Sequence, residues 1–338
     1  MSLSRIFLMT KKDIVLTTRE KFFLAMIIFP IISTFIVNAA LGSTGASNPS
    51  LALYAGDNLK SALMERSTLD IEYFDDPSAL YDAVSKGEYD GGLIVGEYTK
   101  LYMSGNSLLN ERVAIQSTVS SALSEISGKS KALIVESVIL GEEEYSLKVR
   151  IIPFLLIFSV VIAGFIISSS LVEEREKKTI NALLVSPASP LEVIISKSIY
   201  GLFLGIVLSA IVLIMNNALS EPLILFFLFL GTVFTVGIGL LGGAVMDNIT
   251  DLIARMKIFN IFLQFPALVI LFPQIPQWIG KFFPTYYFID PVLRLSQGSA
   301  GFGDVWMHAL VLLGCDIIVI MLASRVLRQR ILGRNLFI

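Results

Sequence analysis

The sequence contains few charged residues and almost no cysteine or histidine. Charged residues make up 16% of its 338 residues, against about 25% in soluble globular proteins. Lysine plus arginine (26) nearly balances aspartate plus glutamate (28), which argues against nucleic acid as a partner because such a partner needs a basic surface. The single cysteine, Cys315, excludes an intrachain disulfide, and the single histidine, His308, excludes a histidine-rich metal site.

The sequence instead has six apolar runs long enough to cross a membrane. A bilayer core about 30 Å thick needs about 20 residues of α-helix. The runs are Phe22–Leu41, Ile151–Val172, Ile199–Met215, Pro222–Met246, Ile258–Ile275 and Trp306–Ser324. Pro266 and Pro273 interrupt the fifth run, which makes it the weakest of the six. The sequence therefore predicts a polytopic α-helical membrane protein with six transmembrane helices.

Basic residues gather in alternate loops, and this pattern predicts how the spans are oriented. Lysine and arginine near span ends are retained on the cytoplasmic side. They are dense in the first 21 residues, between spans two and three, and after span six, whereas the loop 216–221 has none. We therefore expect both termini in the cytoplasm and a location in the cell membrane. A cleaved signal peptide is the alternative for the first run, but its roughly 20 apolar residues exceed the usual 7 to 15.

The one large segment outside the spans, residues 42–149, is acidic and has mixed periodicity. It holds 16 acidic and 8 basic residues. Strand-like runs (51–55, 69–74, 91–96 and 100–104) alternate with helical ones (58–66, 77–86 and 108–140), with turn-forming residues between them. This pattern predicts a small α/β domain, which the orientation of the spans places outside the cytoplasm. The phosphate-binding pattern GxxxxGK[ST] is missing, because Leu123 stands where the GKS at 128–130 needs its first glycine.

Residues 173–198 form a dense charge cluster directly after an uncharged span. Glu173–Leu184 can continue span two as a helix, which Ser186 and Pro187 end. Ser189, Pro190 and Glu192 then have the spacing of a capping box that begins a second helix. The sequence predicts two helices that meet at a proline elbow.

This elbow resembles a motif of the membrane permeases of type-2 ATP-binding-cassette (ABC) exporters. Their pattern in this loop is like E-x-E-x-G-T-x-E-x-L-L-x-S/T-P, followed by a short helix. The matching residues are Glu174, Glu176, Thr179, Leu183, Leu184, Ser186 and Pro187. Lys178 and Asn181 depart from the pattern, because family members usually carry glycine and glutamate there. The resemblance implies that this segment is the coupling surface that docks on a separate ATPase subunit.

The resemblance extends over most of the chain. Residues 11–30 look like the family's amphipathic interface helix leading into the first span, and residues 272–295 resemble its re-entrant pair after span five. The large insert after span one is similar to the arrangement in multidrug, antibiotic and sodium exporters. Independently of the family, three prolines forbid a continuous helix in the apolar stretch 272–295. Such irregular backbone at membrane depth must be covered by protein or line a water-filled cavity.

Two features inside the spans are candidates for special roles. Asp316 lies near the middle of span six, where a carboxylate costs about 2.5 to 3.5 kcal/mol on insertion scales. Its role is either functional, in gating or cation coupling, or structural, in a hydrogen bond to a neighbouring span. Gly239 and Gly243 in span four have the GxxxG spacing that permits close helix approach. This spacing favours packing within one chain, and a dimer contact stays open as the alternative.

These observations predict a permease in three parts. Residues 1–41 hold the cytoplasmic interface helix and first span, 42–149 the extracytoplasmic α/β domain, and 150–338 five further spans with the coupling elbow 173–198 and the re-entrant segment 272–295. The resemblance implies half of an ABC exporter in the lipid membrane, paired with a second permease and with ABC ATPase subunits. ATP and Mg²⁺ would be bound by those ATPase subunits. We expect no catalytic, cofactor or metal residue in this chain, which is therefore not itself an enzyme.

Three alternatives stay open at this point. The first is a permease-like subunit whose ATPase-driven motion serves signalling or lipid extraction. The second is a polytopic sensor whose 42–149 domain binds a ligand, although the 14 residues after Ser324 offer no output domain. The third, a secondary transporter, is disfavoured because ion-coupled carriers usually need more polar groups at the membrane midplane. The transported substrate, whether drug, peptide, lipid or sodium, does not follow from the sequence.

Overall fold

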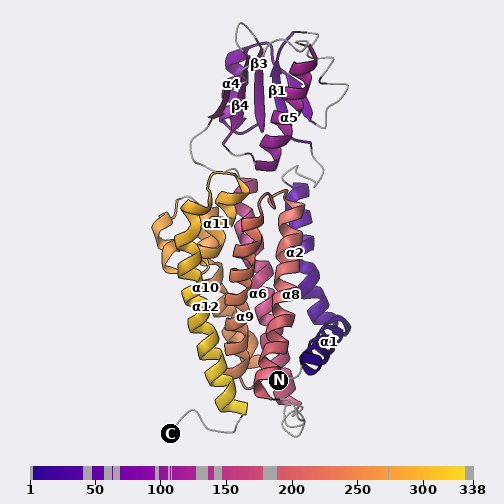
Figure 1. Cartoon of the computed structure of the whole chain (residues 1–338), viewed down its shortest axis with the longest axis vertical. Coiled ribbons are helices and arrows are strands. Elements are labelled where there is room, and N and C mark those ends of the chain that lie inside the picture. The colour runs from indigo at the N-terminus through magenta and orange to yellow at the C-terminus, as the bar shows by residue number, and fades with distance from the viewer. Residues whose placement is uncertain are drawn as a thin grey trace.

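The computed structural model has a bundle of long helices with a small α/β unit at one end (Figure 1). It describes residues 3–40, 48–56, 63, 69–95, 99–105, 107, 109–126, 136–140, 147–177, 189–272 and 274–331. The helices are α1 (Leu3–Arg19), α2 (Lys21–Ala40), α4 (Pro77–Ser85), α5 (Leu109–Ile126), α6 (Leu147–Glu176), α8 (Pro190–Met215), α9 (Pro222–Val245), α10 (Ile249–Leu271), the 3₁₀ helix η1 (Gln277–Phe282), α11 (Tyr286–Ser296) and α12 (Phe302–Ile331). The strands are β1 (Ser50–Tyr54), β2 (Asp70–Tyr73), β3 (Gly91–Val95), β4 (Thr99–Ser104) and β5 (Glu136–Leu140).

Six helices among the described residues are long and apolar enough to span a membrane, which confirms the predicted six-span fold. They are α2, α6, α8, α9, α10 and α12. Two of them begin nine residues before the predicted spans, at Pro190 and Ile249. The apolar part of α8 is preceded by two further turns that start at the capping box at Ser189. Helix α10 begins at Ile249, passes through the buried Pro266 and ends at Leu271, before Pro273.

The α/β unit between α2 and α6 is built on a five-stranded sheet in the order β2-β1-β3-β4-β5. Strands β3 and β4 pair antiparallel, whereas the other neighbouring pairs are parallel. Two adjacent glycines let helices approach both faces of β3: a Cβ on Gly92 would lie 2.6 Å from Leu80 of α4, and one on Gly91 would lie 3.2 Å from Ile115 of α5. The predicted small α/β region is confirmed.

One predicted element of this unit is wrong. We expected a long helix from Leu108 to about Leu140, but α5 ends at Ile126 and Glu136–Leu140 forms β5, which pairs in parallel with β4. The run contains the β-branched residues Val138 and Ile139, which favour strands, and β4 offers it an unpaired edge. The predicted helix over 58–66 lies outside the described residues except for Leu63.

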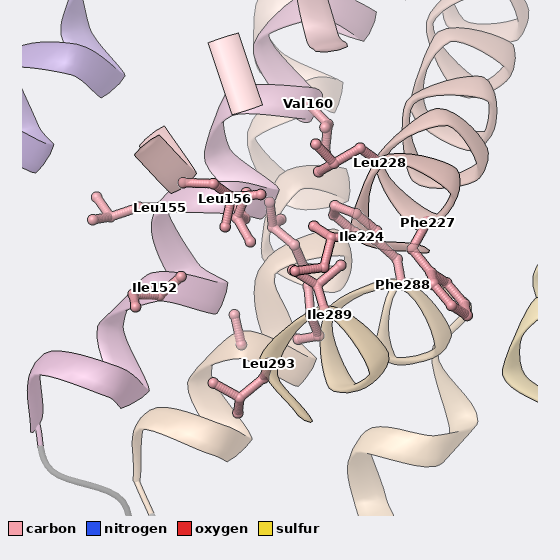
Figure 2. Close-up of a cluster of buried hydrophobic side chains, with 14 of the residues drawn as sticks. Ile152, Leu155, Leu156, Val160, Ile224, Phe227, Leu228, Phe288, Ile289 and Leu293 are labelled. Atoms are coloured by element: carbon pink, nitrogen blue, oxygen red, sulfur yellow. The ribbon is translucent and has the colours of Figure 1, made fainter. Parts of the chain in front are cut away.

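The core of the bundle near the sheet is formed by α6, α9 and α11 (Figure 2). After α10 the chain forms η1 and then α11 instead of one continuous helix. Helix α11 buries Phe288, Ile289 and Leu293 against Ile152 and Leu156 of α6 and against Ile224 and Phe227 of α9. This packing covers the apolar stretch that the prolines prevent from spanning the membrane.

Glycines let the backbones of α6 and α9 come into close contact where the two helices cross. A Cβ on Gly239 of α9 would lie 2.2 Å from the carbonyl oxygen of Gly164 of α6. A Cβ on Gly164 would lie 2.4 Å from the carbonyl oxygen of Thr235, and one on Gly243 would lie 2.9 Å from Leu171. The GxxxG spacing therefore serves packing within one chain.

The end of the bundle opposite the sheet carries α1, the end of α6 and the first turns of α8 and α10 (Figure 1). We call this end the base. Helix α1 does not continue into the first span but stops at Arg19, and α2 begins at Lys21. The base is the part of the bundle from which the predicted coupling elbow departs.

Candidate functional site

The structure describes part of the predicted coupling surface. Glu174 and Glu176 lie in the last turn of α6, and the residues from Ser189 to Ser198 form the cap and first turns of α8. The other matching residues, Thr179, Leu183, Leu184, Ser186 and Pro187, lie outside the described residues. The candidate site can therefore be built from the two helix ends that flank residues 178–188.

Glu174 belongs to a buried group of charges that joins three helices. The Nζ atom of Lys197 on α8 lies 3.4 Å from Oε2 of Glu174 and 3.2 Å from Oδ2 of Asp13 on α1. It also donates a hydrogen bond of 2.8 Å to the hydroxyl of Ser170 on α6. Lys12 donates a 2.8 Å hydrogen bond to Oε1 of Glu174. The Lys197 side chain is only 2% exposed, so it depends on these partners for its charge.

Burial acts in opposite directions on the pKa values of the two α1 members of this group. For Lys12, burial acts to lower the pKa, but the hydrogen bond and charge of Glu174 outweigh it and hold the pKa above its ordinary value. For Asp13, burial raises the pKa above its ordinary value, although the charge of Lys197 opposes the shift. The charges of this group therefore act on one another, and removing one member changes the electrostatic environment of the others.

Arg175, the next residue of α6, holds the end of α9. Its guanidinium donates to three backbone carbonyl oxygens there, those of Met246 (2.7 Å), Gly243 (3.1 Å) and Ala244 (3.2 Å). Its Nη1 atom also lies 3.7 Å from Oδ1 of Asp247. The last carbonyls of a helix have no partner within it and carry partial negative charge. A guanidinium both donates hydrogen bonds to them and compensates this charge.

Glu176, one residue further on, holds the start of α10. Its Oε1 atom accepts a 3.1 Å hydrogen bond from the backbone N–H of Ile249, the first residue of that helix. A carboxylate is favourable at this position because the first N–H groups of a helix are unpaired and point outward. Residues 174–176 thus connect the end of α6 to α1, α8, α9 and α10, immediately before the segment 178–188.

The predicted capping box at the start of α8 is confirmed. The Ser189 hydroxyl accepts from the backbone N–H of Glu192 (3.3 Å), and the Glu192 carboxylate accepts from the N–H of Ser189 (2.9 Å). The Glu192 carboxylate is 2% exposed and also lies 3.6 Å from Nη1 of Arg5 on α1. Helix α1 is therefore attached to the start of α8 as well as to Lys197.

Sequence reasoning missed Asp13, Lys197 and Arg175. The buried residues of α1, Ile6, Thr10, Asp13 and Thr17, recur at helical spacing, but three of them are polar, so no apolar pattern in the sequence marks this face. Lys197 stands two residues before the apolar run that begins at Ile199, where a cation needs an acidic partner. Nothing in the sequence pairs these two residues, which are 184 positions apart.

Asp316 lies on α12 and is 4% exposed. Neither of its carboxylate oxygens has a hydrogen-bond partner among the residues that the structure describes. By contrast, Asn38 of α2, a second polar residue inside a span, donates to the carbonyl oxygen of Met215 at 3.0 Å. The Asn38 side chain therefore makes an interhelical hydrogen bond. No such hydrogen bond is present for Asp316 in the described part of the chain.

Six apolar helices, a tight glycine contact between two of them and a base held by buried charges define a polytopic α-helical membrane protein. The chain belongs to the ABC-2 family of transporter proteins, because the family model matches residues 21–325. It is the permease component of such a transporter, and permeases of this family have no ATPase domain. This confirms the resemblance on which the sequence interpretation relied. No curated protein matches the chain significantly.

Proposed function

We propose that the chain is one half of an ATP-driven exporter. It works with a second permease, either an identical copy or a related chain, and with two ABC ATPase subunits that bind ATP and Mg²⁺. The observation that carries the proposal is the set of contacts made by residues 174–176, which join α6 to four other helices directly before segment 178–188. Family membership implies ATPase partners for a permease without an ATPase domain.

In this proposal the base converts closure of the ATPase pair into movement of the spans. The coupling surface consists of Glu174, Glu176, Thr179, Leu183, Leu184, Ser186 and Pro187. A displacement of this surface pulls on the end of α6, and the contacts of Glu174, Arg175 and Glu176 carry it to α1, α8, α9 and α10. Rigid movement of connected helices is a common form of such transitions.

The proposal also fixes the orientation of the protein in the cell membrane. The base faces the cytoplasm, where ATP is available, and the α/β unit lies outside. The excess of lysine and arginine in the chain segments at the base supports this orientation. Export then follows from alternating access of a path between the two permease halves.

Copurification of the tagged chain from its own membranes tests the proposal. We expect mass spectrometry to identify a copurifying protein with a GxxxxGK[ST] motif and ATP hydrolysis by the complex. The double variant Leu183→Asp, Leu184→Asp should lose this partner. Val113→Asp, on a residue 55% exposed on α5 in the α/β unit, is the matched control and should keep it.

Both variants must show the wild-type gel-filtration profile, so that loss of the partner is not loss of folding. Retention of the ATPase by the leucine variant would show that the coupling surface lies elsewhere on the chain. Absence of any ATPase from folded wild-type protein would overturn the exporter assignment.

We propose further that Asp316 acts in gating or in cation coupling inside the membrane. Its burial without a hydrogen-bond partner among the described residues supports a role that requires a proton, a cation or a moving partner. Asp316→Asn keeps the shape of the side chain and removes the charge. We expect lower ATP turnover by the complex in vesicles at unchanged protein level, whereas wild-type turnover would contradict the role.

A further inference from the structure

A cavity of about 230 Å³ opens at the base, where the chain turns from α1 into α2. Its walls come from α1, the first turn of α2 and the end of α6. Four members of the buried charge group, Lys12, Asp13, Ser170 and Glu174, also line it, whereas Lys197 and Arg175 do not.

The charges that line this cavity favour a cation inside it. The lining residues include four carboxylates, those of Asp13, Glu20, Glu173 and Glu174, but only two ammonium groups, those of Lys12 and Lys177. Three of the four carboxylates already have a cation within 4.0 Å: Glu174 pairs with Lys12 and with the buried Lys197, Asp13 pairs with Lys197, and Glu173 pairs with Lys177. Glu20 is exposed and has no ion pair within 4.0 Å among the residues the structure describes.

The rim of the cavity favours an anion. Lys12 and Lys177 keep 47% and 61% of their side chains exposed. Arg19 and Lys21 flank Glu20 in the chain and are also exposed. A ligand that carries an ammonium group next to a phosphate would therefore satisfy both the acidic wall and the basic rim.

The surroundings of the cavity place it at the surface of a lipid bilayer. Helix α1 is amphipathic and buries one face against the bundle. On its other side it exposes the apolar residues Leu3 (84%), Phe7 (69%) and Leu8 (63%). A helix of this kind lies in the membrane interface with its apolar side chains among the acyl chains. Leu16, which lines the cavity, is 46% exposed. Phe22, which precedes the lining residue Phe23 in the chain, is 55% exposed.

We propose that this cavity binds the phosphoethanolamine headgroup of a membrane phospholipid. The ammonium group enters the acidic wall and approaches Glu20 and Glu173, and the phosphate stays at the rim near Lys12 and Lys177. The acyl chains leave past Leu16 and Phe22 into the bilayer. Phosphatidylcholine is disfavoured because its trimethylated nitrogen donates no hydrogen bond, and phosphatidylglycerol because it has no cation.

Lipid retention by the purified full-length chain tests this site. Protein in detergent is titrated with phosphatidylethanolamine, phosphatidylcholine or phosphatidylglycerol, and native mass spectrometry counts the lipids bound. We expect the first phosphatidylethanolamine to bind about fivefold more tightly than either other lipid, as expected for an added charge contact. The double variant Glu20→Gln, Glu173→Gln should lose this preference.

Glu221→Gln is the matched control, because Glu221 is the N-cap residue of α9 near the opposite membrane surface, and its side chain makes no capping bond with the described start of that helix. It should keep the preference. Equal thermal unfolding of all three proteins in lipid-free detergent shows that folding is unchanged. Equal binding of the three lipids, a preference for phosphatidylglycerol, or a preference that survives in the double variant would overturn the proposal. Soluble phosphoethanolamine that binds as tightly as the lipid would show that the ligand is not held as a membrane lipid.

Discussion

The two ends of the helical bundle are held together by different forces. At the base, the end of α6 contacts its neighbours through ion pairs and charged hydrogen bonds, with Lys197 2% exposed at their centre. At the sheet end, α11 packs against α6 and α9 through apolar side chains, and Phe288 and Ile289 are at most 1% exposed (Figure 2). The α6 helix runs between both ends and takes part in both kinds of contact.

This difference affects how each end responds to movement. Apolar packing is non-directional, so one apolar neighbour can replace another of similar volume. A buried ion pair has a defined partner, and separating it leaves a charge without compensation. The base therefore moves as one connected piece, which suits an end that receives a force, whereas the sheet end can adjust.

The largest effect is expected for Lys197→Met. The substitution leaves Asp13 and Glu174 buried without their shared cation, so the free energy of unfolding in detergent should fall by about 3 to 5 kcal/mol. Chemical unfolding of the purified protein measures the change. Adding Asp13→Asn and Glu174→Gln to the variant removes the uncompensated charges and should restore a large part of the loss.

The pH dependence of this variant tests the same cause. Burial already raises the pKa of Asp13, and loss of Lys197 removes the charge that opposes the shift. The folded state then binds a proton more tightly than the unfolded state, so the variant should become more stable as the pH falls from about 8 to about 5. A stability loss that does not depend on pH would show that packing, and not charge, is what Lys197 contributes.

A smaller effect is expected for Arg175→Gln. The glutamine is too short and carries no charge, so the carbonyl oxygens of Met246, Gly243 and Ala244 lose charged donors, at a cost of about 1.5 to 3 kcal/mol. We also expect weaker coupling between the permease and the ATPase. It is measured as ATP turnover by the complex that no longer depends on the presence of the permease. Arg255→Gln is the control, because Arg255 on α10 is an exposed arginine at the base and its pair is Asp251, four residues away in the same helix.

Gly239→Ala tests the junction between the two ends. The new Cβ would lie 2.2 Å from the Gly164 carbonyl oxygen, so α6 and α9 must separate, with a loss of about 1 to 3 kcal/mol. Thermal unfolding measures this loss. Gly314→Ala on α12 is the control, because its Cβ would meet no atom of another helix within 4 Å among the residues that the structure describes. An equal loss in both variants would contradict the close-contact explanation.

The sequence predicts those parts of the molecule whose signal is local. Apolar runs predict the six spans, and the spacing of Ser189, Pro190 and Glu192 predicts the capping box at the start of α8. The strand β5 was missed because the 136–140 run becomes a strand only through pairing with β4. The base was predicted only in part, since the partners of Glu174 and Glu176 come from distant parts of the chain and leave no local pattern.

The smallest effect is expected for Ile289→Val at the sheet end. This residue is fully buried on α11, so removing one methylene costs about 0.5 to 1.5 kcal/mol through lost contacts and the small cavity that remains. Because no charge is involved, the loss should be the same from about pH 8 to about pH 5, and ATP turnover by the complex should stay at the wild-type level. Unfolding at both pH values, beside Lys197→Met, measures the contrast. A change in ATP turnover from this variant would show that the sheet end also transmits the movement, and the division of the bundle into a connected base and an adjustable sheet end would then be wrong.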